Sequence, residues 1–137
     1  MAAPRTFVLD SSILLLYFAG DKRVEDMINK VNDGIGEGYM LELCVSELFT
    51  KLEEKFGYSQ ASKRLEAIKN SRIKVIRTDY DMMKVAGQIK STHKGRLSMT
   101  SAYMIALAKK LDSVLVTSDD SIGKTNEVKV EYVRSKG

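Results

Sequence analysis

The sequence has a single cysteine, a single histidine and no long apolar run. The lone cysteine, Cys44, excludes an internal disulfide framework and fits a reducing compartment. No apolar run approaches the roughly 20 residues that a transmembrane helix needs. No signal peptide is visible, because the stretch at residues 2–5 is too short for one and includes Pro4. These absences together predict a cytoplasmic protein.

Aromatic residues make up only 7% of the chain, and no basic segment is rich in them. This argues against the aromatic platforms on which single-stranded bases stack. The formal charge of +4 and the pI of about 9.1 permit a polyanionic partner without requiring one. With 137 residues, 44% hydrophobic and 29% charged, the composition predicts one globular domain over residues 1–137.

Short apolar runs alternate with helical patterns along the chain. Residues 6–9 are apolar enough for a strand buried on both faces of a parallel sheet. The GIGEG segment at residues 34–38 follows a helical pattern, so it predicts a helix end and a loop rather than a dinucleotide-binding turn. The alternation predicts an α/β fold with a central, mostly parallel sheet of about five strands flanked by helices. The expected strands are residues 6–9, 39–44, 73–77, 113–116 and 128–133, and the expected helices with their caps are residues 12–18, 23–31, 46–56, 59–69, 79–90 and 98–111.

Acidic residues stand where three of these strands are expected to end. Asp10 ends the first strand, Glu47 begins the helix after the second, and Asp119 and Asp120 follow the fourth. The carboxyl ends of parallel strands are where ligands bind in such folds. Two unit charges about 5 Å apart repel by roughly 3 kcal/mol at an effective dielectric near 20, so grouped carboxylates need protons or a cation. Mg²⁺ or Mn²⁺ bound there suits phosphodiester hydrolysis.

Each acid also has an ordinary structural explanation. Asp10 is a favoured residue for a helix N-cap. Glu47 in a first helical turn complements the helix dipole. Asp119 and Asp120 fit an ordinary polar turn.

Four segments resemble the PIN domain, and most closely the small prokaryotic VapC-type toxins of toxin–antitoxin pairs. They are VLDSS (8–12), VSELFTKL (45–52), LSMTSAYMIALAKKL (97–111) and LVTSDDSI (115–122). Their order along the sequence follows that of the family, so the resemblance extends over essentially the whole chain. The resemblance implies a five-stranded parallel sheet and Mg²⁺- or Mn²⁺-dependent endoribonuclease activity. It also implies an antitoxin protein as partner and a homodimer.

The family's active site groups four acids, and the resemblance assigns three of them to Asp10, Glu47 and Asp119. Ser12 and Thr117 match positions that hold or orient the site. The fourth acid is missing. The family's pattern is L-S-x-x-D-A, and this sequence has Ser101 at the position of the aspartate.

A neutral hydroxyl is a poorer Mg²⁺ ligand than a carboxylate. Three explanations of Ser101 stay open. Asp120 compensates from the adjacent loop, the protein is a natural PIN protein of weakened or absent activity, or Ser101 is an introduced substitution.

The basic loop at residues 90–96 offers Lys94 and Arg96 as phosphate contacts, and His93 within it is expected to be a solvated residue. Two other functions remain as alternatives. One is a non-catalytic PIN protein that binds RNA or a protein, which Ser101 suggests. The other is a receiver domain or phosphotransferase, for which the acids are poorly placed, because Asp10 lacks a second acid two residues later.

Overall fold

The computed structural model describes residues 5–135, and its centre is a five-stranded, fully parallel sheet in the order β3-β2-β1-β4-β5. The predicted α/β class and strand number are therefore confirmed. The strands are β1 (Thr6–Leu9), β2 (Glu37–Leu41), β3 (Lys74–Ile76), β4 (Val114–Thr117) and β5 (Val130–Tyr132). The helices are α1 (Ser11–Phe18), α2 (Lys22–Asn32), α3 (Glu42–Lys69), α4 (Tyr80–Thr92), α5 (Met99–Leu111) and α6 (Asp120–Gly123).

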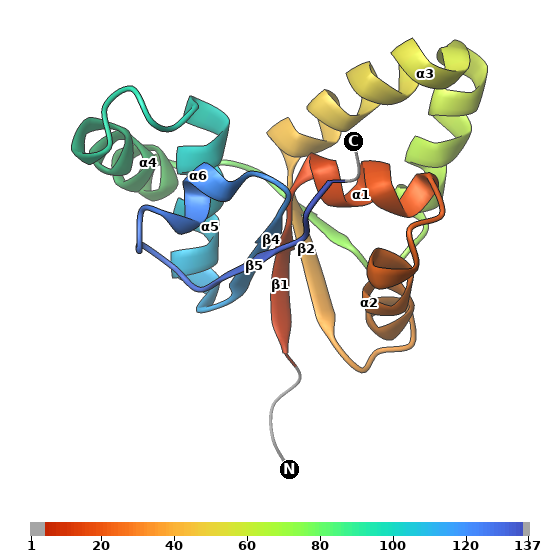
Figure 1. Cartoon of the computed structure of the whole chain (residues 1–137), viewed down its shortest axis with the longest axis horizontal. Helices are drawn as coiled ribbons and strands as arrows, with labels where there is room; N and C mark the ends of the chain where they lie inside the picture. Colours follow the sequence, from red (N-terminus) through yellow and green to blue (C-terminus); the bar gives the residue numbers. More distant parts are fainter. Residues whose placement is uncertain (1–4, 136–137) are drawn as a thin grey trace.

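Helices lie on both sides of the sheet (Figure 1), with α1, α2 and α3 on one side and α4 and α5 on the other. The strands β1 and β4 are buried after their first residues, as their apolar runs require, and Val8, Leu115 and Val116 are 0% exposed. Helix α5 packs on β1 and β4, and its small residues Ala102 and Ala108 are buried. No helix in the part of the chain that the structure describes is long and apolar enough to cross a membrane.

The expected boundaries are wrong around the second strand. β2 begins at Glu37, inside the segment expected to be a loop, and ends at Leu41. Helix α3 therefore begins at Glu42, not at residue 46, and Cys44 is helical rather than in a strand. The main-chain pairing of β1 with β2, in which Phe7 lies opposite Gly38, outweighs the low strand propensity of glycine.

Gly57 interrupts α3, as the sequence predicts. Its φ of 81° and ψ of 167° are not helical, and the helix changes direction there. The first half of α3 begins at the carboxyl end of β2 and runs outward from the sheet (Figure 1). That half contributes one wall of the site described next.

Candidate active-site groove

A groove of about 270 Å³ lies where β1 and β4 end, between α3 and the first turn of α5. It brings together Asp10 from the end of β1, Glu47 from α3 and Asp119 from the end of β4. Ser12 and Ser101, also expected at the site, line it as well. The complete lining is Asp10, Ser11, Ser12, Glu47, Lys51, Ser98, Thr100, Ser101, Met104, Ser118 and Asp119.

Asp10 is a buried carboxylate held by hydroxyl groups. It occupies the N-cap position of α1, but its side chain makes no capping hydrogen bond. Instead its Oδ2 accepts hydrogen bonds from Thr117 Oγ1 at 2.6 Å and Ser12 Oγ at 3.2 Å. Its Oδ1 accepts only a longer bond, 3.3 Å, from Ser11 Oγ. Asp10 is 8% exposed, so these hydroxyls compensate for lost solvation and orient the group, with Oδ1 the less engaged oxygen.

The hydroxyls of Thr117 and Ser12 also connect the end of β1 to the end of β4. Thr117 Oγ1 accepts a hydrogen bond from the Asp119 main-chain N–H at 3.0 Å while donating to Asp10. Ser12 Oγ accepts from the Ser118 N–H at 3.1 Å while also donating to Asp10. The position of Asp10 is thus coupled to the turn that carries Asp119.

Glu47 reaches the groove from the second turn of α3, not from the first turn as the sequence suggested. The helix begins at Glu42, which places Glu47 too far along it to complement the N-terminal dipole. Glu47 is partly buried, and Lys51, one turn further along α3, is exposed. Within residues 5–135, neither side chain forms an ion pair.

Asp119 caps the short helix α6. Its Oδ1 accepts hydrogen bonds from the Ser121 N–H at 3.0 Å and the Ser121 hydroxyl at 2.7 Å. Asp120, the neighbouring acid, is exposed, lies 3.7 Å from Lys124 and does not line the groove. The geometry therefore gives no support to the idea that Asp120 replaces the missing fourth acid.

Ser101 lies inside the groove at the first turn of α5 and is 5% exposed. Ser98 caps this helix as predicted, with its Oγ accepting from the Ser101 N–H at 3.1 Å. The Ser98 hydroxyl also donates to Ser101 Oγ at 2.9 Å. A neutral pair of hydroxyls therefore occupies the place where the family's pattern has a carboxylate.

Cys44 packs next to these acids without taking part in the site. The thiol is fully buried, and this burial raises its pKa far above the usual value, with further contributions from the charges of Asp10 and Glu47. It stays protonated and unreactive at neutral pH, as expected for a buried cysteine.

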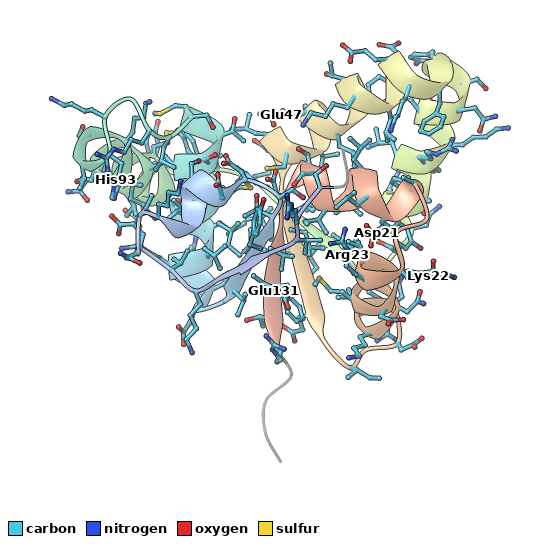
Figure 2. All side chains as sticks on the ribbon, viewed as in Figure 1. Asp21, Lys22, Arg23, Glu47, His93 and Glu131 are labelled. Carbon is cyan, nitrogen blue, oxygen red and sulfur yellow. The ribbon has the colours of Figure 1, made fainter. Side chains whose placement is uncertain are left out.

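The basic loop after α4 lies outside the groove. Lys94 and Arg96 are exposed and do not belong to the lining. His93 is not a free solvated residue, because its Nε2 lies 2.8 Å from Glu127 Oε2. Figure 2 shows His93 on the outer side of the molecule, well apart from Glu47 in this view.

Several lining residues were not identified from the sequence, among them Lys51, Ser98 and Thr100. An exposed lysine and hydroxyls at the start of a helix are common on ordinary helices, so the sequence marked Ser98 only as a helix cap and gave no signal for Lys51 or Thr100.

The chemistry of the donors fits a hard divalent cation. Asp10, Glu47, Asp119 and Ser101 all offer oxygen atoms, which Mg²⁺ and Mn²⁺ prefer. In residues 5–135, however, no three histidine, cysteine, aspartate or glutamate side chains are arranged to hold a metal ion. Mg²⁺ keeps several waters and needs only one or two direct carboxylates, so the groove suits a largely hydrated cation better than a closed cage.

Comparisons with known proteins agree with this fold. Similar solved structures include VapBC2 from Rickettsia felis bound to a DNA fragment from its promoter, with 11% identity and a TM-score of 0.77, covering 93% of this chain and 98% of that one. DNA-bound VapBC from Salmonella typhimurium has 16% identity and a TM-score of 0.76, with the same coverage. VapC20 from Mycobacterium tuberculosis, a sarcin-ricin loop cleaving toxin, has 18% identity and a TM-score of 0.69, covering 90% and 98%.

No curated protein matches the chain. The family model of the PIN domain matches residues 7–128, which include every acid of the groove. The chain belongs to the PIN domain family.

Proposed function

We propose that this protein is a metal-dependent endoribonuclease and the toxin of a toxin–antitoxin pair. The observation that carries the proposal is that Asp10, Glu47 and Asp119 line one groove of a PIN fold. An RNA substrate is supported by the similar VapC20, which is a sarcin-ricin loop cleaving toxin.

Asp10, Glu47 and Asp119 would hold Mg²⁺ or Mn²⁺, with the Asp10 Oδ1 atom the least engaged by hydroxyl donors. When bound, such a cation promotes the ionisation of water and offsets negative charge on a phosphate. Thr117 and Ser12 fix the orientation of the Asp10 carboxylate. Ser101 adds a hydroxyl but no charge, so we propose weaker metal binding than in a groove with four acids.

The direct test is RNA cleavage by the purified chain in Mn²⁺ and in EDTA, beside Asp10→Asn. We expect cleavage only with the metal and a loss of at least about 100-fold in the variant, since that charge is part of the metal site. Equal rates for the two proteins would show that the acids of the groove do no chemistry. Lys55→Gln is a control on the surface of α3, because Lys55 is exposed and outside the groove lining.

Lys94 and Arg96 are proposed contacts for the parts of an RNA that extend beyond the groove. Both are exposed on the loop after α4, where they are free to meet phosphates. Asp120, which pairs with Lys124 and does not line the groove, is not proposed as a direct metal ligand.

Two protein partners are proposed. A cognate antitoxin is supported by the similar structures, several of which are toxin–antitoxin complexes, including one from Klebsiella pneumoniae. A homodimer is supported by exposed apolar side chains around the start of α4, where Tyr80 is 84% and Met83 42% exposed. Sedimentation of the purified chain tests the dimer, and copurification of a small protein with the tagged chain from its native cells tests the antitoxin.

A second candidate function, a non-catalytic PIN protein that binds RNA or a protein, is favoured by one observation. Ser101 and Ser98 form a neutral hydroxyl pair in the groove. RNA binding without calorimetric Mn²⁺ binding supports this alternative, and metal-dependent turnover by this sequence excludes it.

A further inference from the structure

Lys51 is the one basic residue among the described residues that line the groove. Every other charged residue in that lining is an acid, namely Asp10, Glu47 and Asp119. The lining therefore holds a positive charge at a defined place beside three negative ones.

The position of Lys51 follows from helix geometry. It is four residues after Glu47 on α3, which places the two side chains on the same face of the helix. Four residues advance a helix by about 6 Å, and α3 runs outward from the end of β2, so Lys51 lies about one helical turn further from the sheet than Glu47.

The ammonium group of Lys51 is available to a ligand. It forms no ion pair with any acid in residues 5–135, although Glu47 precedes it by one turn. The side chain is exposed, so its charge is not needed to satisfy a buried partner. On the α5 side of the groove, Ser98 and Thr100 supply hydroxyl groups, which hydrogen-bond to phosphate oxygens without adding charge.

We propose that Lys51 binds an RNA phosphate next to the one that is cut, and so holds the strand in the groove. This inference rests on the proposed nuclease function. The acids near the sheet repel a bare phosphodiester strand, and a cation held by them offsets that repulsion only around the scissile phosphate. A lysine about 6 Å further along α3 attracts the neighbouring phosphate. That phosphate does not react, so a positive charge is enough to hold it.

The test compares Lys51→Gln, Lys51→Arg and Lys55→Gln. Binding of a fluorescent single-stranded RNA is measured by anisotropy in an Asp10→Asn background, which prevents cleavage, from about 50 to 200 mM salt. Steady-state cleavage is measured with each substitution in the chain that keeps Asp10. Lys55 is the matched control, because it is a further exposed lysine on the same helix and lies outside the groove lining.

We expect Lys51→Gln to lower the slope of log Kd against log salt by about 0.7, the value for one contact to a single strand, and to weaken binding about fivefold at low salt. KM rises by a similar factor with little change in kcat, because the contact is the same in the ground and transition states. Lys51→Arg keeps the slope of the parent, and Lys55→Gln does not change it.

If Lys51→Gln leaves the salt slope and KM unchanged, the proposed role of Lys51 is wrong. The nuclease function still stands in that case, provided that the parent cleaves RNA. Equal losses in Lys51→Gln and Lys55→Gln also overturn it, because they indicate a general charge effect. A parent that neither binds nor cuts RNA overturns the proposed function itself, and Lys51 with it.

Discussion

Thr117 Oγ1 donates a hydrogen bond of 2.6 Å to Asp10 Oδ2, joining the ends of the two central strands of the sheet. Thr117 is fully buried, and its hydroxyl also accepts from the Asp119 N–H. One side chain therefore positions two of the three acids in the groove.

Thr117→Val keeps the shape of the side chain and removes both hydrogen bonds. It leaves a buried carboxylate and a main-chain N–H without this partner, which we expect to lower the free energy of unfolding by about 1–3 kcal/mol. RNA cleavage falls as well, because Asp10 loses its fixed orientation. Urea unfolding and the cleavage assay measure the two effects.

Thr125→Val is the matched control for that change. Thr125 Oγ1 donates to the Ile122 carbonyl at 2.7 Å and accepts from the Glu127 N–H at 3.3 Å, without touching an acid of the groove. We expect Thr125→Val to lower the free energy of unfolding and to leave the rate of RNA cleavage unchanged. If Thr117→Val keeps full cleavage too, the link between Thr117 and Asp10 is only structural.

Ser101→Asp restores the acid that the family's pattern contains. A fourth carboxylate in the groove, at a site 5% exposed, adds repulsion when no metal is present, so we expect a lower Tm in EDTA. Added Mn²⁺ then raises the Tm of the variant more than that of the parent, because a tighter ligand stabilises the folded state more. Equal Mn²⁺-induced shifts in parent and variant contradict a metal site at Ser101.

The lowered pKa of Glu127 predicts how the free energy of unfolding depends on pH. Hydrogen bonds from Lys109 first and His93 second lower its pKa from an ordinary value of 4.5. The folded carboxyl thus releases its proton more readily than the unfolded one. The contacts of the ionised carboxylate therefore contribute stability above about pH 4.5, and this contribution is lost as the pH falls through the lower folded pKa.

Acid titration of unfolding in the parent and in Glu127→Gln checks this sign. From about pH 7 to about pH 3 the parent loses more stability than the variant, by about 1 kcal/mol or less for such a partly exposed pair. A difference between the two proteins that stays constant through acid pH contradicts the assignment.

The double substitution Lys94→Gln, Arg96→Gln tests the loop after α4. Both residues lie outside the groove lining, so we expect weaker binding of a long RNA, with a salt slope lower by about 1.4, and unchanged binding of an RNA short enough to fill only the groove. Equal loss for both lengths places these residues at the groove itself.

The sequence predicted much of the fold because strand ends and helix caps are local signals. The apolar run that ends at Asp10 predicted β1 correctly, and Asp79 and Ser98 cap α4 and α5 as expected. The start of β2 was missed because Gly36 and Gly38 read as a loop. In the folded chain Gly38 pairs opposite Phe7, and a Cβ there would lie 3.1 Å from Val31, so close packing favours glycine at that point of the strand.

The acids of the groove were anticipated because the carboxyl ends of parallel strands lie at one edge of the sheet. The hydroxyl bridges through Thr117 and Ser12 depend on how β1 and β4 pair, which no local pattern specifies. Lys51 was missed because an exposed lysine on a helix is usually only solvated, and only the path of α3 brings it to the groove.

The measurement that tests the account most directly is the rate of Mn²⁺-dependent RNA cleavage by the parent, by Ser101→Asp and by Ser101→Asp with Asp10→Asn. The account predicts faster cleavage by Ser101→Asp than by the parent, and loss of cleavage when Asp10→Asn is added. Cleavage that survives Asp10→Asn, or no cleavage by Ser101→Asp at any Mn²⁺ concentration, would contradict a nuclease site in this groove.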